Sequence, residues 1–272
     1  MKNWPTMEDS PWRRAYLADL TFGEIYRIVN PFVKGQKLKI LDVGCGNGFL
    51  SLELARKGHD LVGLDKDEMM IKIGRRAMKT DPYKSKRGSL EFEIADFSSW
   101  NSRPRTFDLV IFSRVLHHIR RPGMVLNKVR RILSPRGRII CIEYAYDQFD
   151  RRSATWVYHI RRVLEQAGWF SSKRRLSDNP HSPIDQILKE WRGHGREEGL
   201  NRFEEMYRPL REKFRQRHFS WKPYIFWDLI AEMRIPSVET EMAVARSLRA
   251  MEDALIDRRA IGPILFCFVG AM

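Results

Sequence analysis

Three glycines alternate with other residues in the segment Gly44-Cys45-Gly46-Asn47-Gly48. Glycine has no Cβ, so the backbone can turn sharply there and a ligand can approach the main chain. A helix-forming stretch begins at Phe49, and the free N–H groups of its first turn would lie beside the loop. The spacing predicts a site for a nucleotide-like ligand. A glycine turn can also merely connect a strand to a helix, so a second signal is needed.

Asp65 provides that second signal. It lies 23 positions after Asp42, where a second apolar run ends. A carboxylate at this point of a parallel sheet can bind the ribose hydroxyls of a nucleoside, whereas alone it would more often be a solvated loop residue. The glycines run G-x-G-x-G, and Phe49 stands where the dinucleotide fingerprint G-x-G-x-x-G has its third glycine. The pattern therefore favours a nucleoside-type cofactor over a nicotinamide or flavin dinucleotide.

The segment from Ile40 to Gly48 resembles the first motif of class I S-adenosylmethionine-dependent methyltransferases. Asp65 matches that family's ribose-binding acid, and Ala95-Asp96-Phe97 is similar to the segment that meets the adenine. Val115-Leu116-His117-His118-Ile119 resembles the exit of the fourth strand in the subgroup that methylates small molecules, including quinone-type methyltransferases. The resemblance covers about residues 38–145 and implies S-adenosyl-L-methionine as the cofactor.

The resemblance also implies which residues form the cofactor site: Asp42, Gly44, Cys45, Gly46, Gly48, Asp65, Lys66, Asp96, Phe97, Ser113 and Arg114. In this assignment Asp42 orders the glycine loop and approaches the methionine amino group. Asp96 and Phe97 frame the adenine, and Ser113 and Arg114 border the methionine portion.

Methyl transfer mainly requires that a nucleophile be aligned with the bond to the methyl group. A general base is needed only when the nucleophile must lose a proton. His117 and His118, just past the fourth strand, and Glu143, at the end of the fifth, are the candidates for catalysis. The alternative is that the histidines only shape the start of a helix. The remaining histidines lack the close spacing of metal ligands, so no metal site is predicted.

Strands and helices alternate through the middle of the chain. Apolar runs predict strands at 38–43, 60–64, 90–94, 107–113 and 138–143, with helices at 49–57, 68–78 and 122–133 between them. This alternation predicts an α/β fold with a Rossmann-like, doubly wound, mostly parallel sheet covered on both faces. A further helix is expected at about 12–29, before the first strand.

The pattern changes after the fifth strand. Residues 148–220 are expected to form a helical cap without strands, followed by a helix at 224–233, a strand at 238–244, a helix at 246–258 and a last strand at 264–269. The expected domains are a helical preface (1–37), a cofactor-binding domain (38–147 and 221–272) and the inserted cap (148–220). Two glycines around His194 predict a tight loop at 191–196 that faces a pocket, or a solvated turn.

The chain is strongly basic, with a net charge of +15 and a pI near 10.0. Residues 151–220 carry 16 Lys/Arg against 9 Asp/Glu, so this segment alone contributes +7. Such charge fits a polyanionic partner, or a basic surface that aids solubility or receives an acidic small substrate. The three cysteines lie far apart, and no apolar run reaches the roughly 20 residues of a membrane span. A cytoplasmic protein is expected.

Three functions are compatible with these features. The favoured one is a methyltransferase for a small-molecule substrate held under the helical cap. The alternative is an RNA or protein methyltransferase that uses the basic cap as a platform; against nucleic acid, no Asn/Asp-Pro-Pro-aromatic tetrapeptide follows the fourth strand. The third is a cofactor-binding protein without catalysis. The acceptor and the oligomeric state stay open.

Overall fold

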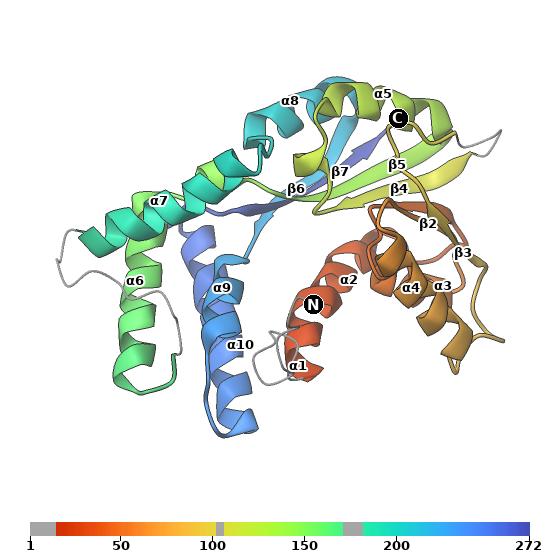
Figure 1. The fold of residues 1–272 in the computed structure, drawn as a ribbon. Coiled ribbons are helices and arrows are strands. Elements are labelled where there is room, and N and C mark those ends of the chain that lie inside the picture. Colours follow the sequence, from red (N-terminus) through yellow and green to blue (C-terminus); the bar gives the residue numbers. More distant parts are fainter. Residues whose placement is uncertain (1–14, 102–105, 171–181) are drawn as a thin grey trace. The chain divides into compact units, whose positions relative to one another are not determined.

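The computed structural model describes residues 15–101, 106–170 and 182–272, which form two compact units (Figure 1). The first, called the sheet unit below, comprises Phe22–Tyr144, Glu204–Ser220 and Phe266–Met272. The second, called the helical unit, comprises the described residues up to Thr21 together with Ala145–Phe203 and Trp221–Leu265. The first residues of the helix expected at 12–29 and residues 171–181 of the expected cap lie outside the described residues.

One seven-stranded sheet contains all the strands of the described residues, in the order β3-β2-β1-β4-β5-β7-β6. The strands are β1 Lys39–Val43, β2 Asp60–Asp65, β3 Leu90–Ile94, β4 Phe107–Ser113, β5 Leu133–Tyr144, β6 Arg215–Lys222 and β7 Leu265–Ala271. Strands β1 to β5 pair in parallel. The predicted Rossmann-like, mostly parallel sheet is confirmed.

Strand β7 lies beside β5 and is antiparallel to it. The Met272 amide donates to the Gly137 carbonyl at the start of β5, and the Ala145 amide donates to the Ile264 carbonyl just past its end. The residues from Leu265 to Gly270 are all buried, because a strand inside the sheet is covered on both faces.

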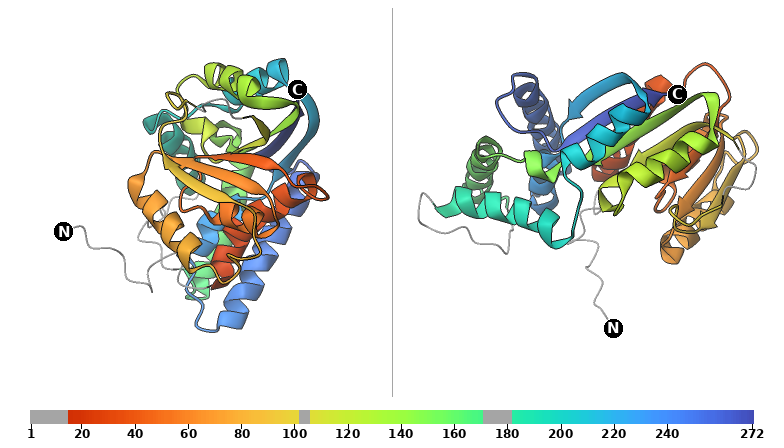
Figure 2. Two further views of the ribbon diagram at one scale, coloured as in Figure 1. Left: turned by 90° about the vertical axis from the view of Figure 1, so that its right-hand side faces the viewer. Right: turned by 90° about the horizontal axis from the view of Figure 1, so that it is seen from above.

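Helices cover both faces of the sheet unit (Figures 1 and 2). Helices α2 Glu24–Val29, α3 Phe49–Arg56 and α4 Glu68–Thr80 lie on one face, and α5 Pro122–Ile132 and α8 Phe203–Lys213 lie on the other. The chain also contains short helical turns, of which η3 Leu116–His118 and η4 Tyr146–Gln148 matter for the sites below. The expected helices between the parallel strands are confirmed to within a few residues.

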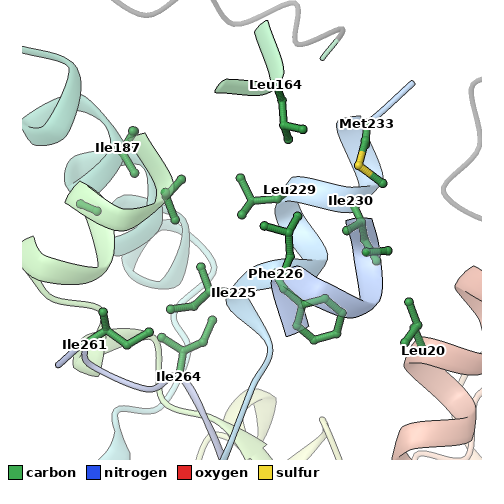
Figure 3. Packing of buried hydrophobic residues seen from close by; sticks show 14 of the residues in the cluster. Leu20, Leu164, Ile187, Ile225, Phe226, Leu229, Ile230, Met233, Ile261 and Ile264 are labelled. Atoms are coloured by element: carbon green, nitrogen blue, oxygen red, sulfur yellow. The ribbon is translucent and has the colours of Figure 1, made fainter. Parts of the chain in front are cut away.

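The helical unit has its own apolar core (Figure 3). It is built from α1 Ala15–Ala18, η1 Asp19–Gly23, α6 Arg151–Gln166, α7 Ser182–Glu197, α9 Ile225–Glu232 and α10 Val238–Asp257. Ile225, Phe226, Leu229 and Ile230 of α9 are buried among side chains from these helices. Burying an aliphatic or aromatic side chain of this size stabilises a fold by about 1.5–3 kcal/mol, so α9 anchors the unit.

Helix α9 begins on a buried carboxylate. Glu252 of α10 is fully buried and accepts hydrogen bonds from the backbone N–H groups of Tyr224, Ile225 and Phe226, at 2.7–2.8 Å. These are N–H groups that have no partner within the first turn of a helix. Burial raises the pKa of Glu252 to about 7 despite these three donors.

Three sequence expectations about secondary structure are wrong. Residues 238–244 form the start of helix α10, which Ser237 caps by accepting from the Thr240 amide. The alternating polar and apolar residues of this segment suggested a strand, although the segment is helical. Strand β6 interrupts the supposedly strand-free segment, because as the last strand of the sheet it has one neighbour and stays largely polar. Residues 191–196 lie inside helix α7 and form no loop.

The chain also divides differently from the three expected domains. Helices α9 and α10 join the helical unit, while α8 and β6 join the sheet unit. Apolar faces buried in a common core decide this division, and the order of the segments along the chain does not reveal which faces meet. Among the described residues, no helix is long and apolar enough to cross a membrane.

Candidate functional site

The glycine loop follows β1, at the carboxyl end of the sheet. Gly44, Gly46 and Gly48 all have positive φ angles, of 67°, 54° and 74°. A Cβ on Gly44 would lie 2.2 Å from a methyl carbon of Val115, so packing within the protein requires this glycine. A Cβ on Gly46 would meet nothing within 4 Å. Gly46 therefore presents bare backbone to open space, as a loop that receives a ligand would.

Asp65, at the end of β2, holds this loop. One carboxylate oxygen accepts from the Gly46 amide at 2.8 Å and the other from the Asp67 amide at 2.9 Å. Each oxygen keeps a second lone pair, so a half-buried carboxylate beside Gly46 can still accept from two hydroxyl groups. Lys66 follows it and is exposed. Asp65 thus lies against the glycine loop, a contact that the sequence did not predict, and its binding of ribose stays a prediction.

Asp42 makes a local contact that the sequence did not predict. Its side chain is buried and accepts a hydrogen bond from the Ser51 hydroxyl at 2.6 Å, which joins β1 to α3. Burial, aided by the nearby Asp65, raises the pKa of Asp42 to about 6 although Ser51 lowers it. Burial also raises the pKa of the Cys45 thiol, which keeps this sulfur protonated and unsuited to nucleophilic attack.

The segment after β3 puts Asp96 and Phe97 in contrasting places. Asp96 is exposed and accepts from the Ser98 amide at 2.7 Å. The Phe97 ring is buried and packs edge-on against Phe112. Lys128 of α5 donates to the Phe97 carbonyl at 2.5 Å and lies 4.9 Å from the centre of that ring. Sequence reasoning missed Lys128, because only the fold brings α5 to this turn.

The exit of β4 contains Ser113 and Arg114, both half-buried. Arg114 has a positive φ of 59°, uncommon for a residue with a side chain, and its amide donates to the Ile142 carbonyl at 2.8 Å. Such backbone strain gathers where a site requires it. It places the turn that follows β4 beside the end of β5.

Glu143, at the end of β5, is fully buried and holds that turn. It accepts from the Val115 amide at 3.0 and 3.1 Å, from the Leu116 amide at 2.7 Å and from Nδ1 of His117 at 2.7 Å. His117 is buried, whereas His118 is exposed with its ring centre 4.3 Å from that of His117. Glu143 thus positions the histidine pair through backbone and ring contacts.

The fold brings most of the predicted residues to one edge of the sheet unit. The ends of β1, β2, β4 and β5 place Gly46, Asp65, Arg114 and Glu143 there, since parallel strands finish on the same side. Open backbone at Gly46 beside a carboxylate with spare lone pairs fits a nucleoside ligand. Among the described residues, no group of His, Cys, Asp or Glu could hold a metal ion.

Residues 34–180 match the family model described as "Methyltransferase domain". The mitochondrial ubiquinone biosynthesis O-methyltransferase of Schizosaccharomyces pombe is 34% identical over 142 residues, 52% of this chain and 50% of that protein. The demethylmenaquinone methyltransferase of Symbiobacterium thermophilum is 30% identical over 156 residues, 55% of this chain and 60% of that protein. The chain thus matches about half the length of these relatives.

Solved structures share the fold at low sequence identity. An S-adenosylmethionine-dependent methyltransferase from Mesorhizobium loti has a TM-score of 0.54 at 17% identity and covers 90% of this chain and 96% of its own. The [4+2]-cyclase SpnF has a TM-score of 0.53 at 15% identity and covers 94% and 81%. Proteins named for different reactions share this architecture, so the fold alone does not decide the reaction.

The contacts of Glu143 predict a mainly structural role. We expect Glu143→Ala to lower the free energy of unfolding by about 3–5 kcal/mol, because it leaves buried N–H donors without an acceptor. Glu143→Gln should cost about 1–2 kcal/mol, since its amide oxygen still accepts. Urea denaturation measures both, with exposed His118→Ala as the control. Unchanged stability in Glu143→Ala would show that these contacts are dispensable.

Proposed function

Because the chain belongs to the methyltransferase-domain family, we propose that it transfers a methyl group from S-adenosyl-L-methionine to a small-molecule acceptor. One observation in the structure carries the cofactor assignment: the bare backbone of Gly46 faces open space beside the Asp65 carboxylate. When bound, the cofactor supplies an activated methyl group on a sulfonium. The protein has to hold the acceptor in line with that bond and exclude water.

Different residues at the carboxyl edge of the sheet bind different parts of the cofactor. Asp65 accepts from the ribose hydroxyls, and Asp96, exposed after β3, receives the adenine amine. Asp42 contributes negative charge towards the cationic methionine portion once it is ionised. Phe97 supports the adenine segment from within the core, since its ring is buried against Phe112.

Glu143 and His117 are positioning residues, because their mutual hydrogen bond and their burial leave them tied to the turn after β4. Where the acceptor must lose a proton, we assign that proton to His118, which is the exposed imidazole of the pair. Such a base contributes rate only when it lies within hydrogen-bond reach of the acceptor.

The acceptor is a small molecule rather than RNA or protein. The relatives named above are ubiquinone and demethylmenaquinone methyltransferases, which supports an acceptor of similar chemical kind, a ring that carries oxygen. All the residues assigned to the cofactor lie in the sheet unit. We therefore propose that the helical unit selects the acceptor.

Transfer of labelled methyl groups tests the function. The protein is incubated with S-adenosylmethionine labelled in the methyl group and with a cell extract, which is then separated into small molecules, RNA and protein. Label should enter the small-molecule fraction. Label confined to RNA or protein would refute a small-molecule acceptor, and no label in any fraction despite cofactor binding would favour a protein without methyl transfer.

Gly46→Ala should weaken cofactor binding without unfolding the protein. Its methyl group would enter the open space where the cofactor lies, so we expect the Kd for S-adenosylmethionine to rise at least tenfold. Gly35→Ala is a matched control, because Gly35 also has a positive φ and an open Cβ position. Both variants should lose about 1–2 kcal/mol of stability. Calorimetric titration measures the difference, and equal affinities in the two variants would contradict the assigned site.

Cofactor affinity should also depend on pH through Asp42. With a pKa of about 6, its carboxyl is mostly ionised at pH 7 and mostly protonated at pH 5, while an α-amino group stays charged throughout. Attraction to the cationic methionine portion is therefore lost as the pH falls, and we expect about tenfold weaker binding at pH 5 than at pH 7. Asp42→Asn should bind weakly with no such dependence. An unchanged pH profile in that variant would exclude Asp42 as its source.

A further inference from the structure

A cavity lies wholly within the helical unit and is lined mainly by arginines. It has a volume of about 250 Å³ and is lined by Tyr146, Asp147, Arg192, Arg196 and Arg202. The segment Trp191-Arg192-Gly193-His194-Gly195-Arg196, which drew attention in the sequence, thus belongs to helix α7 and contributes two of the three cations. No residue assigned to the cofactor contributes to this cavity.

The two α7 arginines are held by their inner nitrogens. Nε of Arg192 donates to the Phe149 carbonyl at 3.0 Å, and Nε of Arg196 donates to the Arg192 carbonyl at 3.2 Å. They stand four residues apart, so they share one face of the helix. Within the described residues, the terminal nitrogens of these two guanidinium groups have no hydrogen bond or ion pair. Each therefore keeps donors of the kind that match a carboxylate or phosphate.

The acidic side chain of the cavity does not neutralise these arginines. One carboxylate oxygen of Asp147 accepts from the Phe203 amide at 2.8 Å, and the other accepts from the Gln148 side chain at 3.0 Å. Asp147 is thus engaged with the backbone and with a neutral amide. Arg192 and Arg196 alone bring two positive charges against the one negative charge of Asp147, so the cavity is suited to an anion.

Gly195 explains how the wall of the cavity forms. A Cβ at this position would lie 2.3 Å from carbons of the Tyr146 ring. Because Gly195 lacks a side chain, the Tyr146 ring can pack against helix α7 there. Gly195 lies between Arg192 and Arg196 in the sequence. Gly195, which predicted a loop in the sequence, therefore lies inside a helix and allows an aromatic ring to pack closely against it.

We propose that this arginine pocket binds a small molecule through a carboxylate or phosphate group. A volume of about 250 Å³ holds an anionic group with part of its ring but not a whole ligand of drug size.

Binding of simple anions tests the pocket without any methyl transfer. Benzoate, phenyl phosphate and the neutral benzamide are titrated calorimetrically into the full chain, into Arg196→Gln and into Lys189→Gln. The last variant removes one charge from an exposed position of the same helix outside the pocket. At least one of the two anions should bind more tightly than benzamide, and the one that does identifies the group. Arg196→Gln should weaken it about tenfold, and Lys189→Gln should not.

Equal binding of anion and benzamide, or equal loss in the two variants, would overturn the anion site. Tighter binding of a short single-stranded RNA, with the same dependence on Arg196, would overturn the small-molecule assignment. Circular dichroism and the melting temperature confirm that Arg196→Gln is folded. Arg192→Lys retains the charge but loses the planar fork, and it should also weaken binding.

Discussion

Acidic side chains accept hydrogen bonds from backbone N–H groups at both ends of the strands in the sheet unit. Glu143 accepts from the Leu116 amide in the turn after β4, and Asp65 accepts from the Gly46 amide in the glycine loop after β1. At the other edge, Asp108 accepts from the Lys39 amide and Asp60 from the Ser89 amide, both at 2.9 Å. An unpaired buried N–H group costs about 1–3 kcal/mol, so the turn after β4 depends on Glu143, whose hydrogen bond from Leu116 is buried.

This constraint separates carboxylates that complete the fold from those that remain available for chemistry. Glu143 is buried and its oxygens are already shared among the backbone and His117. Asp65 is half-buried, and each of its oxygens accepts one hydrogen bond from the backbone. The same residue type at the same kind of place therefore serves positioning in one case and ligand binding in the other. Burial and the number of occupied lone pairs decide between them.

Part of the positive charge of the chain lies around the arginine pocket. Dispersed arginines on helix faces are mostly solvated and contribute little to a specific site. Arg192 and Arg196 differ, because backbone carbonyls hold their inner nitrogens at the edge of a cavity. An arrangement of this kind favours one small anion over the extended phosphate backbone of a nucleic acid, which would need a broad basic surface.

The sequence by itself determined the parallel sheet, its helices and the loop from Gly44 to Gly48, because alternating apolar runs and glycine spacing are local properties. Only the tertiary structure decided that Val115 requires Gly44 while Gly46 stays open, and that Ser51 is the partner of Asp42. It also showed that residues 238–244, expected to form a strand, belong to helix α10. Contacts between distant residues and the burial of whole faces settle such questions, and neither is written in any short stretch of the chain.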